Sequence, residues 1–335
     1  MPEFRVASVQ VVGSPWSSHR REIHLIGFMV RRLFALVPVL LVVGVVVFLL
    51  VHLTPGDPAA LILGETATPE DVAALHSQLG LDAPLWVQFL TWGKGVLSGD
   101  LGDSIIYGHP VLQTIIQRLG PTASIAGLAF AMSLVIAIPS AILAVWKRKS
   151  FLDPTFMSAS LLGVSVPNFW LALMLISFFS VQLGWLPVAG YVPLSEGLWP
   201  WLSHLILPAF VLSVQQAGLI ARMLRDGMLD VLHQNYIRTA RAKGAPEWRV
   251  LRHHTLRNAL LPTITVAGTS LAALLGGAIV TEVVFVIPGI GHLVVDSINR
   301  RDYPVLQGAV LFIAMVYVVV NLLVDLLYSI LDPRV

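Results

Sequence analysis

Cysteine is absent from the 335 residues of the sequence. Its absence excludes disulfide bonds, thiolate zinc sites, iron–sulfur ligation and cysteine nucleophiles, while it leaves the redox compartment open. Charge is scarce as well, because Asp, Glu, Lys and Arg make up 12% of the residues, whereas an ordinary soluble domain carries about 25%. Hydrophobic residues make up 56% and the mean hydropathy is +0.80. This composition excludes an ordinary soluble domain.

Motifs for nucleotide binding and for common catalytic sites are also missing. The P-loop pattern G-x-x-x-x-G-K-[ST] does not occur, because Gln88 stands where its first glycine would have to precede Gly93-Lys94. We therefore do not expect this chain to bind ATP. The zinc motif H-E-x-x-H is absent, and the adjacent His253 and His254 diverge by about 100° on a helix, so they cannot share a metal. No G-x-S-x-G motif is present either, and we expect a non-catalytic protein without cofactor or metal.

Six long uncharged runs predict membrane-spanning helices. A helix rises about 1.5 Å per residue, so about 20 residues cross the roughly 30 Å of hydrocarbon. The first run is longer than the apolar region of a signal peptide, and no small-residue cleavage pattern follows it. We expect an all-α membrane protein with six transmembrane helices and both termini on the same side. The runs are Leu33–Leu53, Leu119–Trp146, Pro154–Leu183, Leu202–Ala221, Asn258–Thr281 and Tyr303–Val324.

The polar segments divide the chain into a short extension, residues 1–28, and a transmembrane domain, residues 29–335. The largest insert in that domain, residues 54–118, is predicted to be a helical cap on the membrane surface. Thr68 suits an N-cap, Pro69 the first helical position and Gly80 the residue after the helix. A second short helix that opens near Asp82 carries Trp and Phe, which are enriched at membrane interfaces.

The distribution of basic residues predicts the orientation. With the N-terminus in the cytoplasm, 17 of the 21 Lys and Arg lie on the cytoplasmic side, including Arg5, Arg20, Arg21, Lys149 and Arg334. The positive-inside rule favours this arrangement. It places residues 54–118 outside and residues 222–260 in the cytoplasm. Because the basic residues cluster at membrane borders, they indicate orientation rather than nucleic-acid binding.

The segment Asn235–Pro262 is the most ordered of the basic polar segments. A helix over Tyr236–Lys243 would end at Gly244, which suits the left-handed position after a helix. Pro246 and Glu247 would then begin a second short helix, where proline is tolerated and an acid meets the positive end of the dipole. We call this segment the elbow. A loop that orients the chain and touches anionic lipid needs only the charge.

Three apolar residues distinguish the elbow from a loop kept only for its charge. Trp248, Val250 and Leu251 follow on the second helix, and together with the glycine stop and the proline restart they suit a rigid insert that docks into a partner. Arg241 and Lys243 could pair with acids of such a partner, or remain solvated or face lipid.

Tyr236–Gly244, with the following Leu256–Pro262, resembles the cytoplasmic signature of ABC importer permeases in the dipeptide/oligopeptide subgroup. The general signature begins Glu-Ala-Ala, and Arg238, Thr239 and Ala240 stand there in this chain. Arg257 replaces its later proline, and these departures are usual in the peptide subgroup. The resemblance covers residues 28–335, and further matching stretches are Gly99–Ser104, Ser165–Trp170, Glu282–Gly291 and Asp302–Pro304.

The resemblance implies a bacterial inner-membrane complex of this chain with a second, similar permease, two cytoplasmic ATPase subunits and an extracytoplasmic substrate-binding protein. It implies that the elbow enters a groove on one ATPase and transmits its motion to the spans, and that residues 54–118 receive the binding protein. The implied substrate is a di- or oligopeptide. The residues expected to couple to the ATPase are Tyr236, Thr239, Ala240, Arg241, Lys243, Gly244, Pro246 and Glu247.

Polar residues inside the predicted spans are candidates for the translocation path, because polar groups in lipid are costly. Asn168, Gln215 and Gln216 would line the path or form hydrogen bonds between helices. Glu282, at the outer end of a span, would meet the amino group of a peptide, contact the binding protein or lie in water at the border. Three glycines of the fifth run would permit a close contact with the partner permease: Gly268, Gly276 and Gly277.

Two other classes of protein fit a six-span chain. An ion-coupled secondary transporter would need a relay of buried charged residues, and no charged residue lies in the middle of a predicted span. A structural membrane anchor would need neither the elbow nor the amides. If the chain is an ABC importer permease, nickel chelates and glutathione are alternative substrates, since the choice of substrate rests largely with the binding protein.

Overall fold

The structure is a computed structural model that describes Phe34 and residues 36–50, 52–53, 59, 63, 68–78, 80–148 and 150–331. The chain divides into two compact units, residues 1–39 and residues 40–335. The described residues of the first unit are helical and begin the helix Leu36–Leu50. The predicted extension, residues 1–28, lies outside the described residues, as do Lys149 and Arg334.

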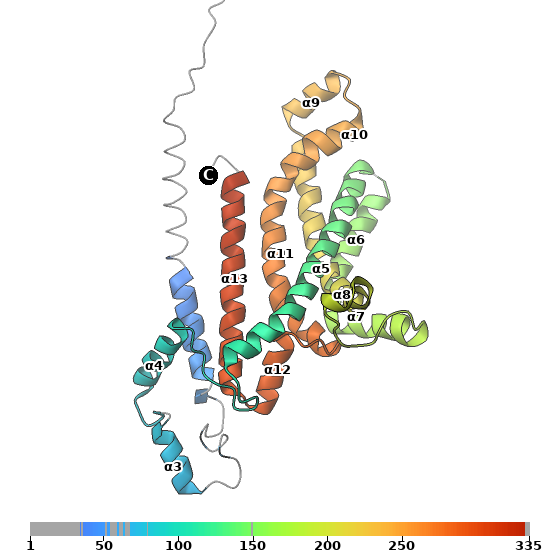
Figure 1. Ribbon diagram of the computed structural model, residues 1–335. Coiled ribbons are helices and arrows are strands. Elements are labelled where there is room, and N and C mark those ends of the chain that lie inside the picture. The colour runs from blue at the N-terminus through green and yellow to red at the C-terminus, as the bar shows by residue number, and fades with distance from the viewer. Residues whose placement is uncertain are drawn as a thin grey trace, which may run out of the picture. The chain divides into compact units, whose positions relative to one another are not determined.

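The second unit consists of helices and turns, with one isolated bridge pair, Asp103 and Pro110, in its described part (Figure 1). Two short helices precede the long ones. In chain order its elements are α3 (Pro69–Gln78), α4 (Leu85–Leu97), α5 (Val111–Trp146), α6 (Leu152–Ser165), α7 (Asn168–Leu175), η1 (Ile176–Gln182), η2 (Leu194–Glu196), α8 (Leu198–Leu232), α9 (Asn235–Ala242), α10 (Glu247–Arg249), η3 (Val250–Leu256), α11 (Arg257–Val284), α12 (Ile290–Arg300) and α13 (Tyr303–Leu331).

Four helices of the described chain are long and apolar enough to cross a membrane. They are Val111–Trp146, Leu198–Leu232, Glu247–Val284 and Tyr303–Leu327. A bent pair of helices makes a fifth candidate if it is counted as one span, and Leu36–Leu50 is a shorter apolar helix. All of these lie within predicted runs or extend them, so the chain is a multi-pass membrane protein, while the count of six spans stays a prediction.

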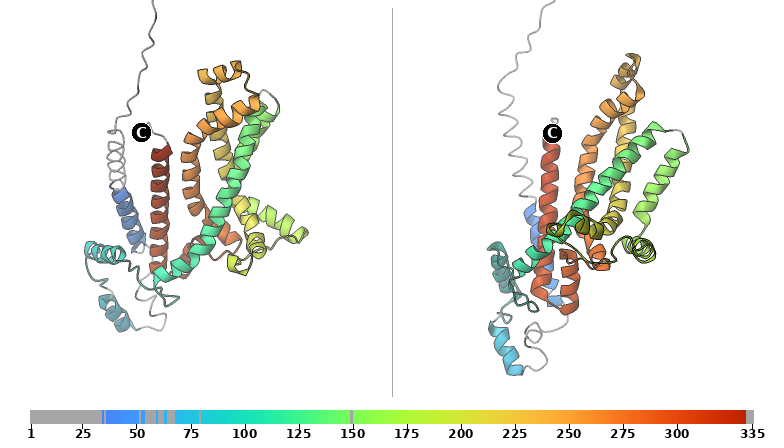
Figure 2. Two further views of the ribbon diagram at one scale, coloured as in Figure 1. Left: turned by 45° about the horizontal axis from the view of Figure 1, so that its top comes forward. Right: turned by 45° about the vertical axis from the view of Figure 1, so that its right-hand side comes forward.

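The third predicted run, Pro154–Leu183, is not one straight helix. Its two halves, 153–165 and 168–182, meet at an angle of 98°. Val166, which lies between them, is extended, with φ −74° and ψ 125°. The cause is Pro167, since proline removes a backbone donor and forces the residue before it out of the helical region. The run therefore turns sharply inside its apolar sequence (Figures 1 and 2).

The insert before α5 confirms the predicted capping of α3. The Thr68 hydroxyl accepts the backbone N–H of Asp71 at 3.2 Å, and the Asp71 carboxylate in turn accepts the N–H of Thr68 at 3.1 Å. Gly80 ends this segment with a φ of +66°. The last residues of the predicted insert already belong to α5, which begins at Val111.

The interior of the second unit runs along α5, α8 and α11. Ile125, Leu205 and Leu274 from these three helices are buried in one cluster. A separate cluster at the α12 end of α11 joins Val111 at the start of α5 to Val305 at the start of α13. The start of α5 is thus packed against α12 and α13.

Two of the sequence stretches behind the family resemblance meet in space. Asp302, which is buried, accepts hydrogen bonds from the Ser104 hydroxyl and from the backbone N–H groups of Ile105 and Ile106. It also accepts the N–H of Val305 in the first turn of α13 at 3.4 Å. One carboxylate therefore caps α13 and fastens the insert to it.

We expect Asp302→Ala to destabilise the folded chain by about 2–4 kcal/mol, because it leaves the Ser104 hydroxyl and neighbouring N–H groups buried without an acceptor. Thermal unfolding of the purified protein in detergent measures the effect. Asp103→Ala, which removes an exposed carboxylate from the same turn, is the matched control and should change the midpoint little. Equal midpoints for the two variants would contradict this role of Asp302.

Candidate functional site

The elbow begins with α9, whose end is fixed by a complete glycine cap. Gly244 has a φ of +80°, its N–H donates to the carbonyl of Arg241 at 2.9 Å, and the N–H of Ala245 donates to the carbonyl of Ala240 at 3.2 Å. This pair of bonds is the Schellman motif, which requires a left-handed residue at the glycine position. The predicted stop at Gly244 is confirmed, and Pro246 is the residue just before the next helix rather than its first residue.

The prediction of two short helices was wrong for the second one. From Glu247 the chain continues without interruption through α10, the π-helical η3 and α11, and ends at Val284 after 38 residues. A π-helical turn admits an extra residue without breaking a helix, so no stop is needed before the span. The elbow therefore consists of α9, a tight turn and the first part of the long helix Glu247–Val284, which we call the rod and which bends between α10 and α11 (Figure 1).

Two of the three apolar residues assigned to docking are internal. Val250 and Leu251 are buried against Leu224 of α8 and Ile237 of α9. Only Trp248 remains half exposed, and its ring lies 5.8 Å from that of Trp146 at the end of α5. The apolar positions serve to hold the elbow on its own chain, because η3 turns them inward toward the helix ends.

An ion pair closes the elbow across the glycine turn. Arg241 donates to Glu247 through Nε at 3.1 Å and through Nη2 at 2.6 Å. The hydrogen bond to Glu247 raises the pKa of the Arg241 guanidinium. Two-point contacts of this kind fix geometry as well as charge. Arg241 therefore has a partner within the chain, whereas a partner acid on another subunit was one of the sequence expectations.

A residue of α11 also holds α9 in place. The Asn258 amide donates to the Tyr236 hydroxyl at 3.0 Å and to the carbonyl of His254 at 2.8 Å. Ile237, on the inner face of α9, is fully buried. The outer face is exposed and basic, and includes Arg238, Thr239 and Lys243. Of the expected coupling residues, Ala240 is partly buried, and Tyr236, Gly244, Pro246 and Glu247 are exposed.

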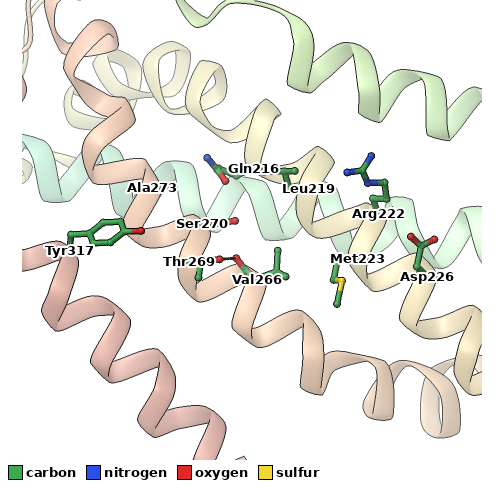
Figure 3. A pocket seen from close by; sticks show the side chains of 10 residues that line it. All are labelled: Gln216, Leu219, Arg222, Met223, Asp226, Val266, Thr269, Ser270, Ala273 and Tyr317. Atoms are coloured by element: carbon green, nitrogen blue, oxygen red, sulfur yellow. Dashed lines mark hydrogen bonds between the residues drawn. The ribbon is translucent and has the colours of Figure 1, made fainter. Parts of the chain in front are cut away.

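A cavity of about 460 Å³ lies between α8, α11 and α13. Gln216, a predicted path residue, projects into it from α8, while Ser270 and Thr269 come from α11 and Tyr317 from α13 (Figure 3). The Thr269 hydroxyl donates to the carbonyl of Val266 at 2.9 Å. Sequence reasoning missed Ser270, Thr269 and Tyr317, because a hydroxyl on an apolar helix gives no signal until the facing helix is known.

A second cavity, of about 370 Å³, brings two other predicted path residues together. Asn168, at the start of α7, and Gln215, on α8, both line it. The wall includes the bend at Val166 and Pro167 and the two glycines Gly276 and Gly277. Non-helical backbone at membrane depth is tolerated where it lines a cavity or is buried in protein, and the bend meets this requirement.

Glu282 lies in neither cavity, and its side chain is fully buried. It accepts the Thr122 hydroxyl at 2.7 Å and the backbone N–H of His292 at 3.0 Å, and the N–H of Gly291 also donates to it. Thr122 in turn accepts the N–H of Ile290 at 2.8 Å. The carboxylate thus fastens the turn between α11 and α12 to α5, instead of facing water or substrate as expected.

The glycines of α11 fall into two kinds. A Cβ on Gly268 would overlap Val324 of α13, so this glycine permits a close contact within the chain rather than with a partner permease. A Cβ on Gly276 or Gly277 would meet nothing within 4 Å. These two residues leave open space in the second cavity.

The fold and the elbow together define a multi-pass helical membrane protein with an ordered, basic elbow at the end of a long apolar helix. The chain belongs to the family of binding-protein-dependent transport system inner membrane components, whose model matches residues 133–335. The model of the N-terminal part of such membrane components matches residues 25–126. The protein is therefore a permease subunit of an ABC importer, a transport subunit, and the ion-coupled alternative has no support.

Relatives with curated names agree with this family. A probable peptide ABC transporter permease of Sinorhizobium fredii is 47% identical over 308 residues, which cover 92% of this chain and 98% of the relative. The dipeptide transport system permease of Alkalihalophilus pseudofirmus is 41% identical over 331 residues, 93% of this chain and 99% of the relative. The glutathione transport system permease of Salmonella choleraesuis is 42% identical over 313 residues, again 93% and 99%.

Among solved structures, an inward-facing form of the MetNI methionine ABC transporter has a chain with the same fold. The TM-score is 0.55 with 19% sequence identity, and the match covers 66% of this chain and 97% of that chain. The likeness shows the fold alone.

Proposed function

We propose that this chain imports di- or oligopeptides across the bacterial inner membrane together with a second permease, two cytoplasmic ATPase subunits and an extracytoplasmic binding protein. The names of the relatives support peptide as the substrate class, and glutathione is itself a tripeptide. Both termini and residues 222–260 lie in the cytoplasm in this proposal, and residues 54–118 lie outside.

The observation that carries the coupling role is the way in which α9 is held. The glycine cap, the Arg241–Glu247 pair and the Tyr236–Asn258 bond fix α9 to the rod that becomes α11. The buried contacts of Ile237 join α9 to α8 as well. A partner that moves the exposed face of α9 therefore moves the ends of two transmembrane helices, because no flexible joint lies between them.

The path in this proposal follows the two cavities. Gln216 lines the cavity beside α13, and Asn168 and Gln215 line the cavity at the α6–α7 bend. Water-filled or polar cavities are the places where polar side chains are tolerated within a membrane. Glu282 has a structural role instead, because its carboxylate is already occupied by donors from the chain itself.

Co-purification from native membrane in mild detergent tests the proposal. We expect a second permease and two ATPase polypeptides to elute with the chain, and ATP hydrolysis to rise when a peptide-loaded binding protein is added. The chain alone supplies no P-loop, so hydrolysis must come from the partners. A chain that elutes alone and moves solute in liposomes under an ion gradient would contradict the proposal.

A further inference from the structure

The cavity between α8, α11 and α13 contains a buried acceptor that lacks a donor. Gln216 is only 7% exposed, and its Oε1 atom has no hydrogen-bond partner within the part of the chain that the structure describes. Nearly all buried polar atoms in folded proteins are paired, so each unpaired one needs a specific explanation. An N–H donor supplied by a molecule in the cavity would satisfy this oxygen.

Farther along α8, the same cavity is lined by Arg222, whose side chain is exposed. Arg222 takes part in no ion pair with the described residues, whereas the nearby Arg225 binds Asp153 at 2.7 Å and Asp226 at 2.9 Å. Asp226, which also lines the cavity, shares Arg225 with Asp153, so Arg225 offsets only part of the charge of these two carboxylates. A planar guanidinium without a partner matches the geometry of a carboxylate.

The separation of the two groups matches a short peptide. Gln216 and Arg222 are six residues apart, which corresponds to about 9 Å along a helix axis. An extended chain spans about 3.3–3.6 Å per residue, so two residues reach about 7 Å and three about 10 Å. The rise along the helix axis is therefore comparable with the length of a di- or tripeptide. Six residues also turn the helix by about 600°, so the two side chains leave α8 about 120° apart and meet only at the cavity that both of them line.

The rest of the lining is suited to side chains of varied shape. Leu219, Val266 and Ala273 provide apolar wall, and Met223 adds a flexible side chain (Figure 3). Methionine adapts to irregular shapes. Gln216 and Arg222 would thus contact the amino end and the terminal carboxylate, which all peptides have. The apolar wall would accept the side chains, which differ between peptides.

We propose that this cavity is a subsite for short zwitterionic peptides inside the permease, where Gln216 Oε1 accepts an N–H of the amino end and Arg222 pairs with the terminal carboxylate. The assignment rests on the proposed peptide-import function and adds the residues that bind the two ends of the peptide where α8 reaches the cytoplasmic side. Gln216 and Arg222 are binding residues in this proposal, since no chemical step occurs at the site.

Uptake by the complete transporter in liposomes tests the proposal. The transporter contains this chain, the second permease, the ATPases and a saturating amount of one binding protein, and the probes are labelled dialanine and its C-terminal amide. We expect Gln216→Leu to lower uptake of both probes about tenfold, because it removes the acceptor. Binding-protein-stimulated ATP hydrolysis should stay within about twofold of wild type, since the elbow is untouched. Gln113→Leu, at an exposed amide of α5, is the matched control and should not reduce uptake.

Arg222 is tested by the ratio of the two probes. Arg222→Gln should lower dialanine uptake about tenfold relative to the amide, because the amide lacks the carboxylate that pairs with Arg222. Arg222→Lys keeps a positive charge and should retain most of the wild-type ratio. The binding protein is the same in every sample, so a change in the ratio reports the permease.

Contact with the peptide is measured directly by photo-cross-linking. Leu219→p-benzoylphenylalanine should attach to labelled dialanine during transport, while the same substitution at Val135, which is 72% exposed on α5 and outside the cavity, should not. Normal uptake and an unchanged ratio in the Gln216 and Arg222 variants would overturn the subsite, as would cross-links from position 219 only to another subunit. Absence of peptide uptake by the wild type would instead overturn the proposed function.

Discussion

Gly244→Pro is expected to leave the chain in the membrane and to reduce transport at least tenfold. Proline fixes φ near −65° and has no N–H, whereas Gly244 has a φ of +80° and donates to the carbonyl of Arg241. Loss of the cap separates Arg241 on α9 from Glu247 on α10, at a cost of about 2–3 kcal/mol to the elbow. Peptide uptake in liposomes, with membrane insertion measured in parallel, gives the result.

The control for this prediction keeps the backbone conformation. A Cβ at position 244 would meet nothing within 4 Å, so the backbone angle is the constraint there rather than space. Gly244→Asn should retain most of the transport, because asparagine tolerates the left-handed region better than other side chains. Wild-type uptake by the proline variant would refute the assignment of the elbow as the coupling element.

Glu282→Leu is expected to cause the largest loss of stability of any single change considered for this chain, about 3 kcal/mol or more. Leucine cannot accept the Thr122 hydroxyl or the N–H groups of Gly291 and His292. The Thr122 hydroxyl keeps a weak second acceptor, the carbonyl of Arg118 at 3.5 Å, whereas the two N–H groups lose the carboxylate that accepts them. The measurement is the unfolding midpoint in detergent, together with the yield of folded protein.

A double-mutant cycle with Thr122→Val isolates the contact. Two residues of one hydrogen-bond network should lose less together than the sum of their separate losses. Glu196→Leu, which replaces an exposed carboxylate in η2, should leave the midpoint almost unchanged. Additive losses at Glu282 and Thr122 would show that the two side chains are not coupled.

Local chemistry allowed several features to be predicted from sequence alone. The Thr68 cap, the glycine stop after α9 and the apolar runs depend on residues close together in the chain. The orientation and the membership of the importer complex depended on charge counts and on the resemblance, and only the family has been tested. These features need no knowledge of which helices are neighbours.

Features that depend on neighbouring helices were not predictable. We predicted Val250 and Leu251 to be exposed docking residues, because no sequence pattern indicates the π-helical turn that points them inward. We predicted Glu282 to lie at the outer end of a span, facing substrate, the binding protein or water. Its donors lie on α5 and near the start of α12, which are distant in sequence or separated by a turn. Proline 167 was visible, but a proline within an apolar run can kink a helix slightly or turn it through the 98° seen here.

The rod from Glu247 to Val284 is one continuous helix. We therefore expect this part of the protein to tolerate insertions and deletions less well than substitutions. Each residue added to a helix turns everything beyond it by about 100° and shifts it by about 1.5 Å. One residue inserted in the α-helical part, between Arg257 and Glu282, would therefore prevent the elbow and the Glu282 carboxylate from keeping their contacts at the same time. Insertions at the exposed residues 194–196 would extend into solvent and leave the packing of the helices unchanged. Relatives that differ in length are thus expected to differ outside the rod.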